Sequence, residues 1–433
     1  MAAAVPRTVL CLSEELGAAG HAAYVVGGSL RDVLLGRPAK DWDLATDALP
    51  ERILEVFAGS VYENAFGTVV VRRDGVPFEI TTFRTDHDYA DFRRPHRVTF
   101  GEDVVADLAR RDFTVNAIAW GRAAGRQPVL VDPFHGIEDV EARILRAVGD
   151  PDARFREDAL RMLRAVRLAA QLGFTVEAAT LAAIRTNAGL VAHLSGERVG
   201  SELRRLLEAT TPSVGLRLAD ETGLLAVIAP DLAAERGAAA HGIPGQDGWD
   251  HTLRTVDAVA ADRPIVRLAA LVHGIGAQRA VALLRRLRTP RATADVVVEL
   301  VRHHEFEVDP AITDPAVRRF IVRVGRDRID DLFALRRADD IGRGLAPEGP
   351  AVATFRARID EQLASGAALD LAALHIDGSD LIRELGATEG PVLGRVLEGL
   401  LDRVIDEPAL NERATLLRLA QGMLAAMDDE ARA

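Results

Sequence analysis

Residues 23–32 have the sequence AYVVGGSLRD, and residues 40–44 have the sequence KDWDL. The first segment predicts a four-residue apolar strand that ends in two glycines, followed by a helix with Ser29 as its N-cap. The second predicts a strand in which Asp41 and Asp43 point to the same face, because side chains alternate along a strand. The chain is therefore expected to begin with a mixed α/β domain.

The glycine pair Gly27-Gly28 and the two aspartates favour phosphate chemistry more strongly together than separately. Exposed amides at a helix N-terminus attract a phosphate, and two neighbouring carboxylates tolerate each other when a divalent cation binds between them. Taken alone, the glycines are typical of a tight turn and the aspartates of a solvated edge strand. Together they predict Mg²⁺-assisted nucleotidyl transfer. Glu79, on the second arm of a predicted hairpin, is a candidate third carboxylate or an exposed edge residue.

The hydrophobic pattern changes near residue 150. Before that point, residues 69–83 predict a hairpin with a turn at Asp74-Gly75, and the aperiodic residues 85–101 predict a mobile loop. Beyond it, helical periodicity dominates, including one helix over residues 155–172. We expect an α+β protein, with a small, strongly twisted sheet followed by helical segments. The expected domains span residues 1–150, 151–235, 249–345 and 346–433.

Arg110-Arg111-Asp112 and Asn116 form a second charged group. The arginines can reach a triphosphate or a sugar, while Asp112 and Asn116 can hydrogen-bond to ribose hydroxyls. The alternative is an ordinary helix C-terminus, where arginines interact favourably with the helix dipole.

A third group, at helical spacing, predicts recognition of a base. It consists of Glu157, Asp158, Arg161, Arg164 and Arg167, which share a broad face if the helix is continuous. A carboxylate accepts a hydrogen bond from the exocyclic amine of cytosine or adenine, and an arginine donates to the adjacent ring acceptor. Uracil and guanine present a carbonyl at that place and are rejected. A solvated charged face is the alternative.

These motifs, in this order, resemble the bacterial class II tRNA nucleotidyltransferases, or CCA-adding enzymes, of the polymerase-β-like superfamily. The resemblance is carried by residues 25–32, 40–43, 107–117 and 156–161. It implies a nucleotidyltransferase head at 1–150, a nucleotide-selecting and RNA-binding neck at 151–235, a helical body at 249–345 and a tRNA-binding tail at 346–433.

The resemblance also implies roles for individual residues. Asp41 and Asp43 would be the catalytic Mg²⁺ ligands, with Glu79 as a further candidate. The implied nucleotide-binding residues are Gly27, Gly28, Ser29, Arg31, Asp32, Arg111, Asp112, Asn116, Glu157, Asp158, Arg161 and Arg164. The implied flexible loop, which assists the switch to ATP, includes Asp88, Tyr89, Asp91, Arg93, Arg94 and Pro95.

The implied reaction adds C, C and A to the tRNA 3′ end from CTP and ATP. The expected partners are the tRNA 3′ end and acceptor arm, with neither DNA nor a membrane. Ten arginines between residues 285 and 328, Arg318 among them, are candidate tRNA contacts or solvated helix faces. An A-adding specialist and a poly(A) polymerase remain alternatives, although poly(A) polymerases usually end in a basic extension. An RNA-binding module with an inactive head is disfavoured because both aspartates are intact.

A second resemblance involves His251, residues 271–276 and His303-His304, which are similar to a degenerate HD phosphohydrolase segment. That fold needs an intact His-Asp pair for its metals. Because Gly274 stands where the aspartate belongs, we expect a helical structural remnant and not a second active site.

Composition sets further limits. The 433 residues carry a net charge of −12, which argues against indiscriminate binding of polyanions but not against a local basic groove. No apolar stretch reaches 18 residues, so a membrane span is not expected. Cys11 is the single cysteine and cannot form an internal disulfide, which favours the cytoplasm.

Overall fold

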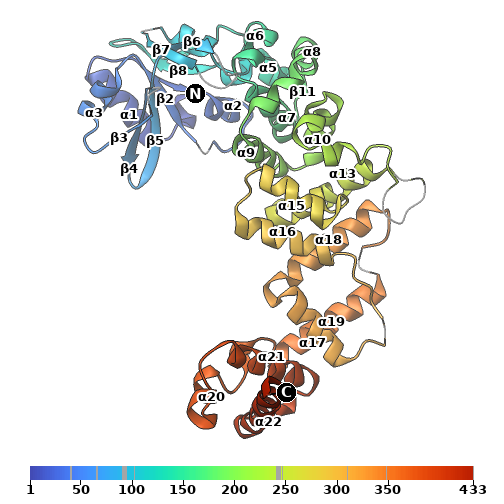
Figure 1. The fold of residues 1–433 in the computed structure, drawn as a ribbon. Helices are drawn as coiled ribbons and strands as arrows, with labels where there is room; N and C mark the ends of the chain where they lie inside the picture. The colour runs from blue at the N-terminus through green and yellow to red at the C-terminus, as the bar shows by residue number, and fades with distance from the viewer. Residues whose placement is uncertain are drawn as a thin grey trace. The chain divides into compact units, whose positions relative to one another are not determined.

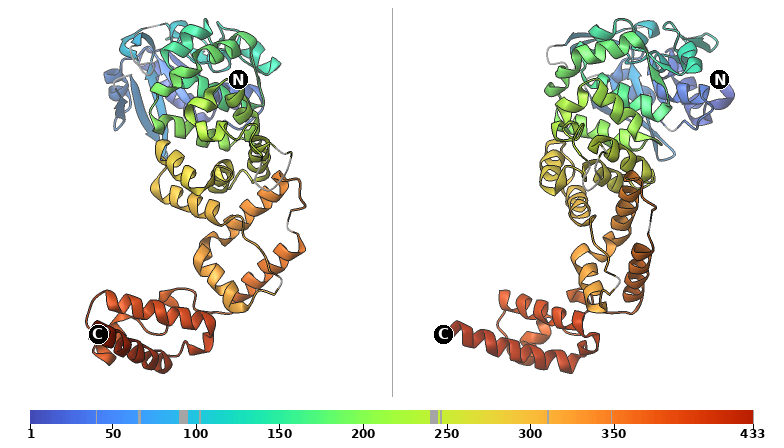
Figure 2. Two further views of the ribbon diagram at one scale, coloured as in Figure 1. Left: turned by 45° about the vertical axis from the view of Figure 1, so that its right-hand side comes forward. Right: turned by 90° about the vertical axis from the view of Figure 1, so that its right-hand side faces the viewer.

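The computed structural model describes residues 1–39, 41–64, 67–89, 95–101, 103–239, 245, 247–309, 311–347 and 349–432 (Figure 1). The large sheet lies in the blue and cyan part of the chain, and the part drawn from green to red is almost entirely helical (Figure 2). The expected α+β class, with a sheet-containing head and a helical remainder, is confirmed.

The head contains a seven-stranded mixed sheet. In spatial order its strands are β3 (Val61–Asn64), β4 (Thr68–Arg73), β5 (Val76–Thr82), β2 (Asp43–Thr46), β1 (Ala23–Val26), β8 (Ala119–Arg122) and β9 (Val129–Val131). The predicted hairpin is confirmed as β4 and β5. Its turn residues Asp74 and Gly75 have φ values of 52° and 80°, and two positive φ angles fit the turn that joins twisted antiparallel strands.

The core of the head forms between this sheet and its helices. All four residues of β1 are buried, and Tyr24 and Val26 pack with Phe83 and Leu108. Helix α1 (Arg7–Ala18) buries residues spaced three to four apart, the period of one helix face. The other helices of the head are α2 (Gly28–Leu34), α3 (Pro50–Val56), α4 (Val104–Ala109) and α5 (Gly136–Ala142).

Two local predictions near β1 are wrong in detail. Strand β2 begins at Asp43, so Asp41 lies before the strand and not within it. The N-cap of α2 is Gly27, with a φ of 83°, and not Ser29. The Ser29 hydroxyl instead donates back to the carbonyl of Val26. Because a glycine tolerates positive φ without steric cost, the helix starts two residues earlier than the side-chain cap predicted.

The aperiodic segment after the hairpin is not a simple loop. Strands β6 (Arg84–Tyr89) and β7 (Pro95–Phe100) pair as an antiparallel ribbon, with Arg84 opposite Phe100. The sequence of this segment is polar and lacks the alternation of apolar residues that predicts a strand. A two-stranded ribbon need not bury one of its faces, so it can form without that alternation. The ribbon lies between β5 and α4 in the sequence.

The single helix predicted over residues 155–172 is two helices. Helix α6 (Pro151–Glu157) ends at Asp158, whose φ and ψ of −140° and 105° are extended, and α7 (Leu160–Leu172) follows. The prediction failed because the periodicity of charged residues continues across the break. The helices that follow are α8 (Ala178–Asn187), α9 (Gly196–Leu207), α10 (Pro212–Glu221), α11 (Leu224–Ile228), α12 (Pro230–Ala233) and α13 (Gly248–Ala258).

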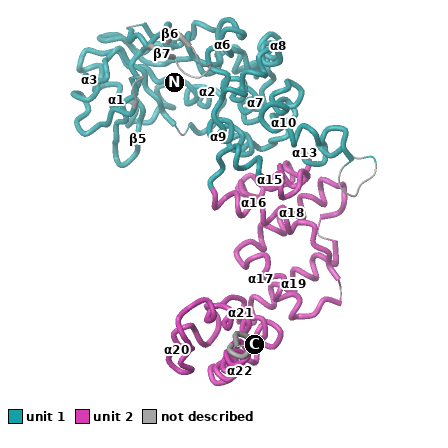
Figure 3. Tube along the Cα trace, in the orientation of Figure 1, with its two compact units in different colours: residues 1–253, 282–290 teal, residues 254–281, 291–433 magenta. Residues whose placement is uncertain are grey.

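The chain divides into two compact units (Figure 3). Unit 1 consists of residues 1–253 and 282–290, and unit 2 of residues 254–281 and 291–433. The four domain boundaries expected from the sequence remain predictions. The remaining helices are α14 (Pro264–Val272), α15 (Gly276–Arg286), α16 (Arg291–His303), α17 (Asp314–Val324), α18 (Ile329–Gly342), α19 (Pro350–Ala364), α20 (Gly378–Leu385), α21 (Pro391–Asp406) and α22 (Arg413–Arg432).

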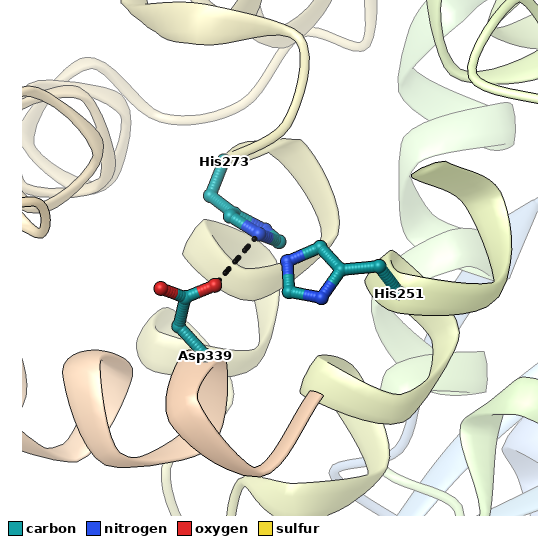
Figure 4. A group of neighbouring side chains, drawn as sticks. All are labelled: His251, His273 and Asp339. Carbon is teal, nitrogen blue, oxygen red and sulfur yellow. Dashed lines mark ion pairs between the residues drawn. The ribbon is translucent and has the colours of Figure 1, made fainter. Parts of the chain in front are cut away.

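Unit 2 buries charged side chains among its helices. Arg318 is 6% exposed and donates to the carbonyl of Ile405 and to the side chain of Gln362, so it is a structural residue and not a candidate tRNA contact. His273 Nε2 and Asp339 Oδ1 lie 3.5 Å apart (Figure 4), and Arg343 pairs with the other oxygen of Asp339.

His251, also drawn in Figure 4, lies on the part of α13 that belongs to unit 1.

Among the described residues, no single helix has the length and apolar composition to cross a membrane. The bent pair α14 and α15 meets those criteria only when its two helices are combined.

Candidate active site

A cavity of about 870 Å³ in unit 1 brings the sequence motifs together. Its lining includes Gly27, Gly28, Ser29, Arg31, Asp32, Asp41, Asp43, Arg111, Asp112, Asn116, Asp158, Arg161 and Arg164. Eight arginines and five aspartates line it, so the cavity is locally basic although the chain is acidic overall. A locally positive surface of this kind favours an anionic ligand such as a nucleoside triphosphate.

The glycine turn is shaped by two arginines that lie against it. A Cβ atom on Gly27 would approach Arg111 Nη1 to 3.1 Å, and one on Gly28 would approach Arg31 Nη2 to 3.2 Å. Glycine at both positions therefore lets guanidinium groups lie close to the backbone. The positive φ of Gly27 adds a second reason why a side chain is disfavoured there.

The sheet register places the carboxylates beside the glycine turn. Val26, the residue before Gly27, pairs with Asp43 across β1 and β2. Strands β2 and β5 run parallel with Leu44 opposite Ile80, so Asp43 and Glu79 occupy corresponding positions one residue earlier. The tertiary structure thus brings Glu79 near the predicted aspartate pair, although Glu79 is outside the lining of the cavity.

The electrostatics confirm this proximity. Burial, together with the negative charges of Glu79 and Asp41, raises the pKa of Asp43 to about 6, while Arg111 opposes the shift. Burial, together with Glu63 and Asp41, also raises the pKa of Glu79. Neighbouring carboxylates whose charges repel one another form a site that a divalent cation would stabilise.

A chain of hydrogen bonds joins the first motif to the third. Arg31 donates to Asn116 Oδ1 at 2.6 Å, and Asn116 Nδ2 donates to Asp112 Oδ1 at 3.0 Å. Asp112 Oδ2 then accepts from Arg164 Nε at 2.7 Å and Nη2 at 2.6 Å. Residues 85 positions apart in the sequence are therefore held in one network. Asp32 extends it by pairing with Arg31 at 2.9 Å.

Protein donors already use the acceptor positions of Asp112, the carboxylate that was predicted to hydrogen-bond to ribose. Besides Asn116 and Arg164, it accepts a hydrogen bond from the backbone of Phe113. Burial alone would raise the pKa of Asp112, but Arg164 and Asn116 hold it below the usual range for a carboxyl group. A carboxylate offers about four acceptor positions, and four donor nitrogens occupy them in this structure.

Asp107 anchors the two arginines of the second motif. It is 1% exposed and pairs with Arg110 at 2.7 Å and with Arg111 at 3.3 Å. Burial alone would raise the pKa of Asp107, but the two arginines lower it below its ordinary value. Asp107 lies in the segment 107–117 that carries the family resemblance, but its residue type alone did not predict this role, since an aspartate is usually solvated.

The predicted base-selecting residues lie on both sides of the break between α6 and α7. Arg161, on α7, pairs with Glu157 at 2.6 Å and donates to the backbone carbonyls of Arg154 and Arg110. Asp158, in the break, pairs instead with Arg198 of α9 at 2.9 Å. The predicted common helix face is therefore wrong for Asp158. Asp158 and Arg161 nevertheless both line the cavity, whereas Glu157 is outside its lining.

Sequence reasoning missed part of the lining. The residues that no sequence pattern indicated are Pro38, Leu160, Leu168, Gln171, Arg198 and Arg205, whereas Arg110 and Arg167, which also line the cavity, belong to the second and third charged groups. Helical spacing singled out Arg167 as a charged residue, but no motif indicated α9. The predicted flexible loop is largely outside the description: Asp91, Arg93 and Arg94 are not among the described residues, and only the backbone of Asp88, Tyr89 and Pro95 is described, in β6 and β7.

Comparison with known proteins gives a consistent result. Residues 23–146 match the poly A polymerase head domain, and residues 173–236 match the probable RNA and SrmB-binding site of polymerase A. The CCA-adding enzyme of Geobacillus stearothermophilus is 36% identical over 413 residues, covering 94% of each chain. This chain belongs to the family of CCA-adding enzymes. It is a nucleotidyltransferase of the bacterial class II group within that family.

Other CCA-adding enzymes support the same assignment. That of Lacticaseibacillus paracasei is 35% identical over 426 residues, covering 96% of each chain. The crystal structure of the Bacillus stearothermophilus CCA-adding enzyme in complex with CTP has a TM-score of 0.74 and 32% identity, covering 97% of this chain and 98% of that one. The Thermotoga maritima CCA-adding enzyme complexed with tRNA, at 20% identity and a TM-score of 0.60, shows the shared fold.

Proposed function

We propose that this nucleotidyltransferase adds C, C and A in turn to the 3′ end of tRNA, using CTP and ATP without a nucleic-acid template. In each cycle the terminal 3′-hydroxyl of the tRNA attacks the α-phosphate of the bound nucleotide. A phosphodiester bond forms, the bond to the β-phosphate breaks, and pyrophosphate leaves. The observation that carries the proposal is the single cavity in which the glycine turn, the aspartates and the base-selecting residues meet.

The donor set at one end of the cavity fits Mg²⁺. Asp41, Asp43 and Glu79 offer oxygen ligands, which Mg²⁺ prefers, and burial together with the charges of Glu79 and Asp41 raises the pKa of Asp43. We propose Asp41 and Asp43 as the principal ligands, with Glu79 as a third carboxylate. When bound, Mg²⁺ would stabilise negative charge on the phosphates and favour deprotonation of the attacking hydroxyl.

The chain's own residues bind and orient the nucleotide around this centre. The backbone at Gly27-Gly28, with Arg31 and Arg111 lying against it, is proposed to hold the triphosphate. Asn116 is proposed to position Arg31, and Asp112 to position Arg164, through the hydrogen bonds described above. Asn116 is also the proposed hydrogen-bonding partner of the ribose. The Ser29 hydroxyl donates to the carbonyl of Val26 within the turn, and the Asp32 carboxylate accepts a hydrogen bond from Arg31.

Selection of CTP and ATP is proposed to depend on Asp158 and Arg161. An ionised carboxylate can only accept hydrogen bonds, so Asp158 would attract the exocyclic amine of cytosine or adenine and repel the carbonyl of uracil or guanine. Arg161 would donate to the neighbouring ring acceptor, with Glu157 holding its guanidinium by the ion pair. We place this reaction in the cytoplasm, consistent with a tRNA substrate and a single cysteine.

The test is end-point extension of three tRNAs, one lacking CCA, one ending in C and one ending in CC. Each is incubated with CTP, ATP or both, in the presence of Mg²⁺. We expect all three to reach CCA and then stop. Extension of only the CC-ended tRNA by one A would identify an A-adding specialist, and unlimited addition of A would identify a poly(A) polymerase. Either result would overturn the proposal.

A further inference from the structure

One of the eight arginines that line the nucleotide cavity differs from the other seven. Each of those seven forms an ion pair with an aspartate or a glutamate, at N–O distances from 2.6 to 3.3 Å. Arg205, on α9, is exposed at the cavity and has no ion pair within the part of the chain that the structure describes. Protein carboxylates therefore offset the other positive charges of the lining, whereas that of Arg205 is left for a ligand.

The direction of Arg205 follows from its place on α9. Arg198, Glu202 and Arg205 are spaced four and three residues apart, so they share one face of this helix. Arg198 and Arg205 both line the cavity. Glu202, one turn before Arg205, is the carboxylate of that face, but it pairs with Arg167 at 2.6 Å. Arg205 therefore meets the cavity without a neutralising partner on its own helix face.

Helix α7 holds the backbone of Arg205 in place. Gln171 Nε2 donates to the carbonyl oxygen of Arg205 at 2.8 Å, and Gln171 Oε1 accepts from Arg167 Nη1 at 2.8 Å. Arg37, in the segment after α2, donates to the backbone carbonyls of Gln171 and Leu172, each at 3.3 Å. Three segments are therefore joined at this end of the cavity, and the exposed guanidinium of Arg205 extends from a fixed backbone position.

This end of the cavity is distinct from the end proposed to select the base. Arg161 lies in the first turn of α7 and Gln171 in its last, about 15 Å apart along the helix axis. The hydrogen-bond network from Arg31 to Arg164 ties the glycine turn to the first half of α7 as well. The proposed contacts to the base, the sugar and the triphosphate lie in that half. The lining near the other end of α7 consists of Pro38, Leu168, Gln171 and Arg205.

We propose that Arg205 binds a phosphate of the last two nucleotides of the tRNA, the strand that supplies the attacking 3′-hydroxyl. A guanidinium is always charged and presents several N–H donors to phosphate oxygens. Pro38 stands three residues before Asp41, so this end of the lining continues directly into the proposed metal ligands. The inference rests on the proposed function and adds to it the position of the tRNA 3′ end within the cavity. The triphosphate of CTP or ATP has the same chemistry and is the competing ligand.

The first measurement is equilibrium binding of a tRNA lacking CCA, without nucleotide, at several salt concentrations. Wild type is compared with Arg205→Gln and Arg205→Lys. Arg185→Gln, at an exposed position of α8 outside the cavity lining, is the matched control for loss of one positive charge. A second tRNA, shortened by two further nucleotides at its 3′ end, lacks the phosphates assigned to Arg205. Extension kinetics with varied tRNA and varied CTP follow, together with thermal unfolding.

We expect Arg205→Gln to weaken binding of the tRNA lacking CCA by about threefold to tenfold at low salt, the scale of an exposed contact between a guanidinium and an anion. The slope of log affinity against log salt concentration should fall by about 0.7, the value for one phosphate contact on a single strand. KM for tRNA should rise by the same factor, while KM for CTP stays unchanged. Arg205→Lys should recover most of the affinity, because it keeps the charge.

The shortened tRNA locates the contact. Wild type and Arg205→Gln should bind it equally, because the partner phosphates are gone. Arg185→Gln should behave as the wild type with both tRNAs. Because Arg205 is exposed, the thermal midpoints of its variants should match that of the wild type.

Three results would overturn the inference. They are an unchanged affinity for tRNA in Arg205→Gln, an equal loss with the longer and the shortened tRNA, and a raised KM for CTP with an unchanged KM for tRNA, which would assign Arg205 to the triphosphate. The proposed function fails separately, when the wild-type protein does not extend tRNA with CTP and ATP. Normal extension with unaltered tRNA binding in Arg205→Gln refutes only the role of Arg205.

Discussion

At the scale of one residue, Asp43 shows that a side chain placed for function can lower the stability of the fold. Its strand position beside Val26 is fixed by the sheet, and that position buries its carboxyl group near Glu79 and Asp41. The raised pKa means that ionisation of Asp43, which cation binding needs, is less favourable in the folded protein without a cation than in the unfolded chain. Function and stability therefore make opposite demands on this residue.

Asp43→Asn should abolish nucleotidyl transfer and stabilise unit 1 at neutral pH in the presence of a chelator. The folded pKa of about 6 lies above the unfolded value, so the folded state holds the proton more tightly and wild-type stability falls as pH rises from about 4 to 6. The expected gain above pH 6 is roughly 1–3 kcal/mol. Urea unfolding at pH 4 and pH 7 tests it. An equal difference at both pH values would contradict this assignment.

Arg161→Ala should relax nucleotide choice and also lower stability. The side chain bridges the carbonyls of Arg154 and Arg110, so its removal takes one donor from each carbonyl and leaves Glu157 paired with Arg154 alone. We expect a loss of about 2–4 kcal/mol, the range for breaking a buried charged network. Chemical denaturation and misincorporation of UTP measure the two effects. Arg185→Ala, on the exposed side of α8, serves as the control, and equal stability of both variants would argue against a bridging role.

At the scale of elements, the break between α6 and α7 determines the position of Asp158 more than either helix does. Continuous helical periodicity across residues 155–172 suggested one charged face, but local charges could not reveal that Asp158 leaves the helix. The ion pair with Arg198, forty residues away, is a tertiary contact. Helix α9 in turn packs closely against the backbone carbonyls of Arg286 and Leu287, at Gly196 and Gly200.

Gly196→Ala should disturb the site without touching the nucleotide. A Cβ atom there would lie 1.9 Å from the carbonyl oxygen of Arg286, so either α9 or that segment must move. We expect a destabilisation of about 1–3 kcal/mol, as for other overpacked positions, and weaker discrimination between CTP and UTP. Gly189→Ala, which has open space around it, is the matched control. Equal thermal midpoints for the two variants would refute the close packing.

At the scale of the whole molecule, charge and connectivity are distributed unevenly. The chain has a net charge of −12, yet its nucleotide cavity has more arginines than aspartates. Unit 1 is also discontinuous, because residues 282–290 return to it after an excursion into unit 2. Leu283, Leu284 and Leu287 in that segment are buried, which makes it part of the core that supports α9.

This connectivity predicts different behaviour for two truncated chains. A chain ending after Pro290 should retain CTP binding, because it keeps the segment that packs against Gly196 and Gly200. A chain ending after Leu253 should lose binding and unfold at a lower temperature, since the removed leucines leave apolar surface exposed. Equilibrium dialysis with CTP and thermal unfolding compare the two. Equally tight binding by both chains would show that α9 does not need residues 282–290.

The sequence alone determined the α+β class, the four ordered motifs, the hairpin and the family, because these depend on local patterns and on residue types that phosphate chemistry requires. Only the tertiary structure placed Glu79 beside Asp43, joined Arg31 through Asn116 and Asp112 to Arg164, and paired Asp158 with Arg198. The tertiary structure also decided the break at Asp158, the early start of α2 with Gly27 as its N-cap, and the ribbon of β6 and β7. Such features depend on contacts between residues far apart in the chain, and neither periodicity nor spacing records them.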